Sequence, residues 1–403
     1  MSLSTLPLSY CTNVHPAKTV AEVEAGLDQY TVPVKQNYGQ PLAAGLWLAN
    51  SVIQELKSSP QAVQKFVAGI QSRGLSCHTL NAFPYGDFHS ERVKEQVYLP
   101  DWTSPDRLRY TFDCAQVLAA LLPDGTEGSI STVPFGFSMF DHATDFYDRC
   151  FDQLIELSRQ LDDLHDESGR CIRLAIEPEP FCLLEMTEEQ VLPVFEKLRS
   201  RADDAGALDI VNRHIGLCYD VCHQAVEFED IPKSIGAINS AGIRINKVHI
   251  TCAIHIDNPA ENLEAREALA QYVEPRYMHQ TMALAADGEV LRIPDLTTDV
   301  VLNSDDDSPF LNATAWRVHY HVPVDAESLG PLGTTRGELK SALKTVADLE
   351  YAPHLEVETY TWEVLPDGNS TNLVDGLTNE LVATKNLLDN LQGGGKPPQL
   401  KIV

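Results

Sequence analysis

Short apolar runs alternate with amphipathic stretches along most of the chain. This alternation is typical of βαβ units, in which buried strands are joined by helices that cover a parallel sheet. Eight units of this kind predict a (β/α)8 TIM barrel, although a doubly wound open sheet stays possible because a count of strands does not prove closure. The eight apolar runs cover residues 6–14, 43–49, 75–83, 128–135, 171–178, 214–221, 245–252 and 354–361.

Two of the amphipathic stretches carry clear helix start signals. Ser104 and Pro105 occupy cap and first-turn positions before a helix expected over 104–122. Thr187 is followed by two glutamates, which favours a helix over 187–204. A last helix is predicted near 372–391, and the glycines and prolines after it predict a flexible tail over 393–403.

The connection between the seventh and eighth runs, residues 253–353, is far longer than the others. Within it the pattern predicts a helix at 261–273, a hairpin around Asp287-Gly288 and a strand over 316–324. Connections of this length in compact domains are usually functional, so we expect a lid or substrate wall. The alternative is that the insertion has no role in the site or serves oligomerisation. We therefore expect one barrel domain over residues 1–392 that contains this insertion.

Charge and composition narrow the classes of partner. The chain of 403 residues carries 30 Lys and Arg against 58 Asp and Glu, a formal charge of −28, which disfavours nucleic acid as a partner. No stretch approaches the roughly 20 apolar residues of a membrane span, and the first residues lack a basic region before an apolar core. We expect a cytoplasmic protein without membrane insertion. The nine scattered cysteines favour buried, reduced thiols.

Carboxylates and histidines follow four consecutive predicted strands. In a barrel, the ends of these strands meet at the face where active groups lie. Several carboxylates buried together are costly unless a cation neutralises them, so we predict a divalent metal site. Oxygen and imidazole ligands without thiolate suit Mn²⁺, Mg²⁺ or, less well, Zn²⁺. The groups lie at or just after the strand ends: Glu177 and Glu179 at the fifth run, Asp220 and His223 at the sixth, His249 at the seventh, and Glu356 and Glu358 at the eighth.

The ordered set of ligands and the D-x-x-H motif resemble the xylose isomerase-like TIM barrels. That family includes sugar epimerases and the endonuclease IV type of repair enzyme. The resemblance implies metal ligands at Glu177, Asp220, His249 and Glu358. Side chains two residues apart share one face of a strand, so parity does not choose within each Glu pair. The family's A-x-E-P and L-x-x-E-T contexts select Glu177 and Glu358.

A closer resemblance is to the metabolite traffic proteins called EboE. It covers nearly the whole chain and implies a place in a secondary-metabolite pathway. It does not specify a reaction or a ligand. The segments that carry it are Thr12–Pro16, Asn81–His89, Val93–Tyr98, Pro100–Trp102 and Glu274–Gln280.

Other histidines are secondary candidates. His319 and His321 alternate along a predicted strand and face one side, and the endonuclease branch holds additional zinc at the corresponding place. Together with His223 they could bind a second metal or the substrate. Hydrogen-bonded structural histidines are the alternative. Candidate substrate contacts, which follow strands or lie in the insertion, are His15, Asn81, His89 and His279.

These features lead to one main hypothesis and two alternatives. We expect a metal-dependent isomerase or epimerase of a small polyhydroxylated metabolite, such as a sugar, sugar phosphate or cyclitol. Glu177 and Glu358 would transfer a proton through a metal-stabilised enediolate. One alternative is a metabolite-binding or trafficking protein that keeps the metal site without turnover. The other is a phosphodiesterase similar to endonuclease IV, which the acidic charge and the lack of a histidine in the fourth run disfavour.

Overall fold

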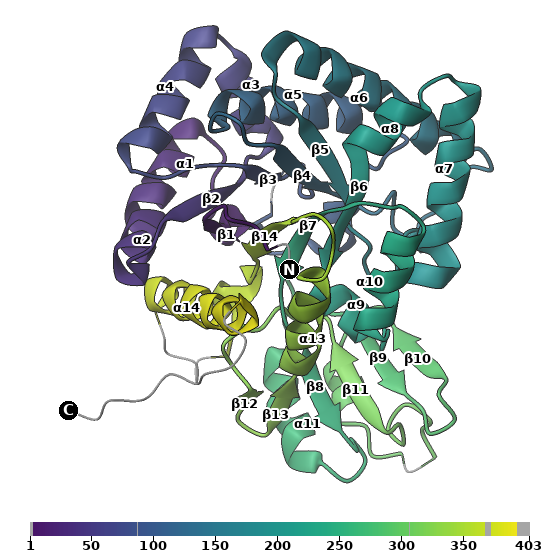
Figure 1. Ribbon diagram of the computed structural model, residues 1–403. Coiled ribbons are helices and arrows are strands. Elements are labelled where there is room, and N and C mark those ends of the chain that lie inside the picture. Colours follow the sequence, from purple (N-terminus) through teal and green to yellow (C-terminus); the bar gives the residue numbers. More distant parts are fainter. Residues whose placement is uncertain (1–2, 87, 306, 367–371, 393–403) are drawn as a thin grey trace.

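A computed structural model describes residues 3–86, 88–305, 307–366 and 372–392. Its centre is a closed barrel of eight parallel strands in the order β1-β14-β7-β6-β5-β4-β3-β2 (Figure 1). Closure confirms the predicted (β/α)8 barrel and excludes the open sheet. Every predicted apolar run overlaps one barrel strand. The strands are β1 (Leu8–Cys11), β2 (Leu42–Trp47), β3 (Thr79–Asn81), β4 (Gly128–Thr132), β5 (Ile172–Ile176), β6 (Ile215–Asp220), β7 (Ile245–Ile250) and β14 (His354–Val357).

Helices between the strands surround the barrel (Figure 1). Their apolar faces cover the sheet, which explains the amphipathic pattern of the connections. The α-helices outside the β7–β14 connection are α1 (Val20–Gly26), α2 (Val32–Tyr38), α3 (Asn50–Lys57), α4 (Pro60–Ser72), α5 (Pro105–Leu121), α6 (Phe146–Ser168), α7 (Leu192–Asp204), α8 (Leu208–His214), α9 (Val221–Val226), α10 (Ile231–Ser240) and α14 (Leu373–Gln392). The predicted tail over 393–403 lies outside the described residues.

Local chemistry explains where two of these helices begin. The Ser104 side chain caps α5 by accepting from the Asp106 amide, and Pro105 occupies the first turn as predicted. The helix expected from residue 187 begins as a π-helix, η4 (Thr187–Val191), and continues as α7. Pro193 lies at this junction and has no amide hydrogen to donate, so regular α-helical bonding is interrupted there.

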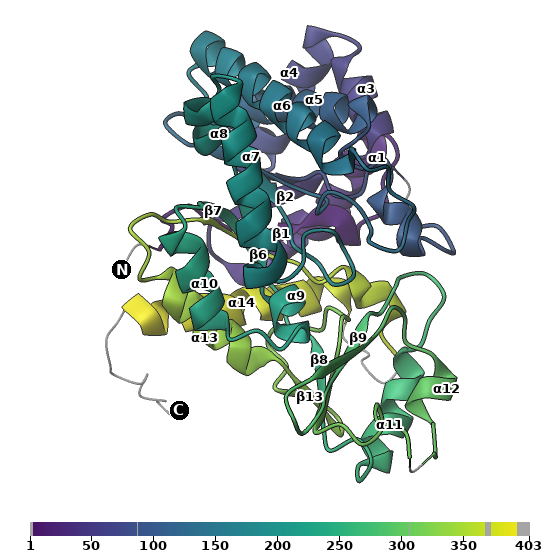
Figure 2. The same cartoon turned by 90° about the vertical axis from the view of Figure 1, so that its right-hand side faces the viewer.

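The connection between β7 and β14 folds largely into a second sheet. This antiparallel sheet has the order β10-β9-β11-β8-β13-β12 and lies at one end of the barrel (Figures 1 and 2). The expected hairpin is β9–β10, with Gly288 in the left-handed region at φ 91°. Its elements are β8 (Ile254–Asp257), α11 (Leu263–Leu269), β9 (Thr281–Leu284), β10 (Val290–Ile293), α12 (Thr298–Val301), β11 (Ala315–Val318), β12 (Ser328–Leu329), β13 (Leu332–Thr334) and α13 (Arg336–Val346).

The strand expected over 316–324 ends early. Its ladder stops at Val318, and the following amides bond elsewhere: His319 donates to the Gln280 carbonyl and Val322 to the Cys252 carbonyl. This change of partner carries the chain away from the sheet and towards the barrel. The helix expected at 261–273 is α11 followed by the 3-10 turn η5 (Ala270–Tyr272).

Two further expectations concern cysteines and membranes. All nine cysteines are unpaired; eight are buried and Cys171 is half-buried, which confirms the expected free thiols. Among the described helices, none combines the length and the hydrophobicity that a bilayer crossing requires.

Candidate metal centre and pocket

Four side chains converge at the carboxyl end of the barrel strands. Glu177 follows β5, Asp220 ends β6, His249 lies in β7 and Glu358 follows β14. His249 Nδ1 is 3.0 Å from Glu177 Oε1, 3.0 Å from Glu358 Oε2 and 3.5 Å from Asp220 Oδ2. One ligand atom from each residue lies within 4.8 Å of all the others, and all four residues are buried. The structure therefore brings the four predicted metal ligands together.

The cluster has the electrostatics of a cation site. Loss of solvation on burial raises the pKa of Glu177 to about 7, and the neighbouring Glu358 and Asp220 carboxylates add to this effect. Burial also opposes ionisation of Asp220, yet neighbouring His223 and His321 hold its pKa below the ordinary value. Glu177 Oε2 and Asp220 Oδ2 are buried and accept no hydrogen bond from the residues that the structure describes. Buried oxygens without donors are costly, and a divalent ion such as Mn²⁺, Mg²⁺ or Zn²⁺ would satisfy them.

Local structure explains the D-x-x-H motif. Asp220 is the N-cap of α9, and its Oδ1 accepts from the His223 amide at 3.1 Å and from the Thr251 hydroxyl at 2.7 Å. These bonds fix one carboxylate oxygen and leave Oδ2 facing the cluster. They also set the start of α9, which carries the His223 side chain to the same face.

Tertiary contacts distinguish the members of each Glu pair. Asn13 Nδ2 and Asn81 Nδ2 donate to Glu358 Oε1 at 2.9 and 2.8 Å, which orients Oε2 towards His249. Glu356 instead pairs with Lys247 at 2.7 Å inside the barrel, and both side chains are fully buried. Glu356 Oε1 is also 3.4 Å from His249 Nε2, so it lies behind the cluster and can orient the imidazole.

Glu179 lies beside a second group of residues. Its Oε1 accepts a 2.7 Å hydrogen bond from the Tyr98 hydroxyl and is 3.8 Å from His319 Nδ1. Burial raises the pKa of Glu179 well above the ordinary value, and the Glu177 carboxylate adds to this effect. Glu177 and Glu179 thus occupy different surroundings, although they share one strand end.

Three histidines form the second group. His223, His319 and His321 place their Nε2 atoms together: His319 Nε2 is 3.1 Å from His223 Nε2 and 3.3 Å from His321 Nε2. Each Nδ1 donates to an oxygen: the Pro178 carbonyl, the Gln280 side-chain oxygen or the Glu358 carbonyl. The Nε2 lone pairs of neutral rings therefore face one another.

Such an arrangement suits a metal ion better than hydrogen bonding. The two separations are close to the roughly 3.3 Å between nitrogens in tetrahedral coordination at about 2.05 Å. Asp220 Oδ2 lies 4.0 Å from both His223 Nε2 and His321 Nε2. Asp220 therefore belongs to the four-residue cluster and also borders the histidines. Burial lowers the pKa of His319 well below its ordinary value, as do the two neighbouring imidazoles, which keeps its lone pair free.

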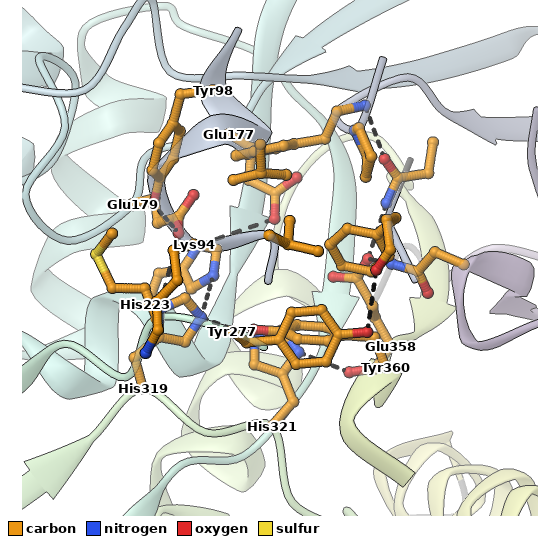
Figure 3. Close-up of a pocket in the computed structure, with 18 residues that line it drawn as sticks. Lys94, Tyr98, Glu177, Glu179, His223, Tyr277, His319, His321, Glu358 and Tyr360 are labelled. Carbon is orange, nitrogen blue, oxygen red and sulfur yellow. Dashed lines mark hydrogen bonds and ion pairs between the residues drawn. The ribbon is translucent and has the colours of Figure 1, made fainter. Parts of the chain in front are cut away.

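Both groups open on one pocket of about 60 Å³ (Figure 3). Glu177, Glu179 and Glu358 reach its surface with the three histidines, while Asp220 and His249 are fully buried behind them. The volume is several times the roughly 10–15 Å³ that one water needs. The site therefore has room for a small molecule.

The four candidate substrate contacts differ in whether they line the pocket. Asn81 lines the pocket, whereas His15, His89 and His279 are not among the described residues that do. His15 stacks on Tyr30, with ring centroids 4.4 Å apart. His89 Nε2 bonds the Asn13 carbonyl oxygen at 2.8 Å, and His279 Nε2 lies 2.8 Å from Glu274 Oε1. Their predicted substrate contacts stay predictions, and their present partners are protein groups.

Several residues that line the pocket were not predicted from the sequence as site residues. These residues are Asn13, Lys94, Tyr98, Tyr277 and Tyr360. The first four lie in segments that carry the EboE resemblance, and Tyr360 lies just after β14. Asn13 and Tyr360 were detectable because they lie near the ends of the first and eighth predicted runs. Lys94, Tyr98 and Tyr277 come from long connections, for which periodicity does not show which side chains face the barrel.

Comparisons with known proteins give only distant likenesses. No family model and no curated protein matches the sequence. Similar solved structures include the IolI protein with a bound zinc atom, 11% identical, covering 96% of this chain and 99% of that one at a TM-score of 0.47. D-psicose 3-epimerase crystallised with D-fructose is 12% identical, with coverage of 97% and 100% and a TM-score of 0.47. A D-tagatose 3-epimerase-like protein reaches 0.48 at 11% identity, covering 96% and 99%.

These neighbours are described as sugar epimerases or as zinc-binding, but their similarity is too low to assign a family. The fold rests on the closed barrel itself. The resemblance to EboE proteins stays a prediction.

Proposed function

We propose that this protein is a metal-dependent isomerase or epimerase of a small polyhydroxylated metabolite. The observation that carries the proposal is the cluster of Glu177, Asp220, His249 and Glu358 at the floor of a pocket. A divalent ion held there would polarise a substrate carbonyl and make the neighbouring carbon-bound hydrogen acidic. The acidic surface charge of −28 favours a small ligand over DNA.

The four residues divide into two pairs by exposure to the pocket. Asp220 and His249 are fully buried and would hold the ion from behind. Glu177 and Glu358 also line the pocket, so each has a carboxylate within reach of a bound molecule. They approach His249 Nδ1 from different strands, which suits removal of a proton by one and its return by the other.

The decisive experiment replaces Glu358 with glutamine. Glu358→Gln keeps the shape and one oxygen but loses the basicity needed to move a proton. With Mg²⁺ or Zn²⁺ present, the wild type should exchange a carbon-bound hydrogen of its ligand with deuterated water. The variant should bind that ligand and exchange it at least roughly a hundredfold more slowly. NMR on ketoses, sugar phosphates and cyclitols measures both properties.

Glu196→Gln on the exposed surface of α7 is the matched control and should exchange like the wild type. A wild-type protein that binds a ligand with metal but leaves every carbon-bound hydrogen in place would support the trafficking alternative instead.

We further propose that His223, His319 and His321 bind a second divalent ion, with Asp220 between the two positions. Elemental analysis should find two zinc equivalents per wild-type chain and about one in His319→Gln, because two imidazoles are a weaker site than three. His255→Gln in β8 removes a histidine away from the group and should keep both ions. Equal zinc content in the wild type and His319→Gln would refute the second site.

A further inference from the structure

The outer half of the pocket differs in character from its floor. Carboxylates and imidazoles form the floor, whereas the walls are apolar and come from the β3–α5 connection and the insertion. Phe83, Phe88, Val93, Val97 and Met278 contribute to these walls. Aromatic rings from Tyr277 and Tyr360 face the same space (Figure 3). A ligand that reaches past the metal ligands therefore meets mainly hydrocarbon.

Most polar groups of the wall are already bonded within the protein. Tyr98 donates its hydroxyl hydrogen to Glu179, and Tyr277 donates to the Phe88 carbonyl at 3.3 Å. Asn81 uses Nδ2 on Glu358 and Oδ1 on the Phe83 amide. A substrate hydroxyl placed beside Tyr98, Tyr277 or Asn81 would have to break one of these bonds or remain unpaired, and both are costly. Asn13 Oδ1 has no hydrogen-bond partner among the described residues, but Asn13 bonds Glu358 and so lies at the metal end.

Charge disfavours an anionic substituent at the same place. Lys94 is the one lysine or arginine among the described residues that line the pocket. Its Nζ is engaged by Asp295 Oδ2 at 2.6 Å. A phosphate at this wall would therefore find no free lysine or arginine among the described lining residues to balance its charge.

We infer that the substrate is amphipathic: it carries its carbonyl and hydroxyl oxygens at one end, for the metal, and an apolar substituent at the other. This inference rests on the proposed function, because the metal site defines which end is polar. Within the expected class it selects a partly deoxygenated or alkyl-bearing hydroxycarbonyl compound, and it disfavours free ketoses and sugar phosphates.

Two probes of equal size separate these possibilities. Erythrulose and 1-hydroxy-3-methylpentan-2-one share a hydroxyketone head and differ only in two hydroxyls replaced by methyls. Calorimetry on the zinc-loaded protein should show at least tenfold tighter binding of the methyl compound, since burial of each methyl is favourable and two hydroxyls would lack partners. Equal or tighter binding of erythrulose, or no measurable binding of the methyl compound, would overturn the inference.

A variant of the wall tests where the preference arises. Met278→Gln keeps the length of the side chain and adds an amide that can bond a hydroxyl. It should reduce the binding preference for the methyl compound at least threefold. Met139→Gln is the matched control, because Met139 is 60% exposed and lies outside the pocket, and it should preserve the preference. An unchanged preference in Met278→Gln would overturn the assignment of this wall.

Hydrogen exchange distinguishes failure of the inference from failure of the proposed function. Suppose that erythrulose binds more tightly than the methyl compound and exchanges a carbon-bound hydrogen with solvent. This result would refute the amphipathic substrate but would still support the proposed isomerase. Tight binding of the methyl compound without exchange of either probe would keep the amphipathic ligand and refute turnover of hydroxyketones.

Discussion

At the scale of single residues, hydrogen-bond partners decide which of several similar side chains serves the site. Glu356 and Glu358 lie on the same face at the end of β14. Glu356 forms an ion pair with a lysine, whereas Glu358 accepts hydrogen bonds from two asparagine amides. His15 shows the same effect in the opposite direction. It follows the first strand, as a site residue would, but Tyr10 and Tyr30 enclose it within the fold.

The enclosure of His15 predicts a specific acid sensitivity. Burial lowers the pKa of His15 to about 3, so below pH 6.5 the unfolded chain takes up a proton that the folded chain refuses. Stability is therefore lost as the pH falls. Between pH 7 and pH 5 this residue should contribute a loss of about 2 kcal/mol.

His15→Gln should remove that contribution. Urea unfolding at the two pH values measures it: the variant should lose about 2 kcal/mol less on acidification than the wild type. A variant as acid-sensitive as the wild type would show that His15 is protonated in the folded protein.

At the scale of elements, β7 and β14 build the support behind the proposed metal ligands. Their register pairs His249 with Glu356 and His354 with Lys247. The Glu356 carboxylate extends across the barrel to β2, where a Cβ on Gly45 would overlap its Oε2. This position requires glycine because it gives space to the carboxylate, while the backbone conformation is ordinary.

The Lys247–Glu356 pair should be strongly coupled. Lys247→Met leaves a buried carboxylate without its cation and should cost about 3–5 kcal/mol of unfolding free energy. Glu356→Leu should also be destabilising, while the double variant should lose less than the sum of the two, because it buries no charge. Urea unfolding of the four metal-free proteins tests this, and strictly additive losses would contradict the coupling.

At the scale of the whole molecule, the insertion completes a pocket that the barrel only begins. Val93 and Lys94 of the β3–α5 connection donate backbone bonds to the Arg276 carbonyl of the insertion, at 2.8 and 2.9 Å. Lys94 pairs with Asp295 across the same boundary. These contacts hold the apolar wall beside the proposed metal ligands. The role of the insertion as a substrate wall stays a prediction.

Metal binding should stabilise the entire fold, because the ligands come from β5, β6, β7 and the end of β14. An ion at a hundred times its dissociation constant adds about 2.7 kcal/mol to the unfolding free energy. Protein stripped with chelator should melt at a lower temperature and recover with Zn²⁺ or Mn²⁺. Asp220→Asn should recover much less, and an equal recovery in this variant would place the stabilising ion elsewhere.

The local pattern of the sequence predicted the eight barrel strands and the helices between them, whereas closure of the barrel was shown by the structure. Strands and helices alternate because each must bury one face against the barrel, and this requirement leaves a periodicity that can be read without the structure. The same pattern placed Asp220, His249 and both members of each Glu pair at strand ends, where parallel strands bring their side chains to one edge. The choice of Glu177 and Glu358 within the pairs came from the family resemblance.

Tertiary structure decided the rest, since the deciding contacts join residues that are remote in the sequence. Asn13, which lies 345 positions away, donates a hydrogen bond that orients Glu358 towards the cluster. Lys247 on the neighbouring strand instead pairs with Glu356 inside the barrel. The antiparallel sheet of the insertion depends on pairings between short strands whose order leaves no local signal. The convergence of three Nε2 atoms and the apolar wall of the pocket likewise exist only once the insertion has folded against the barrel.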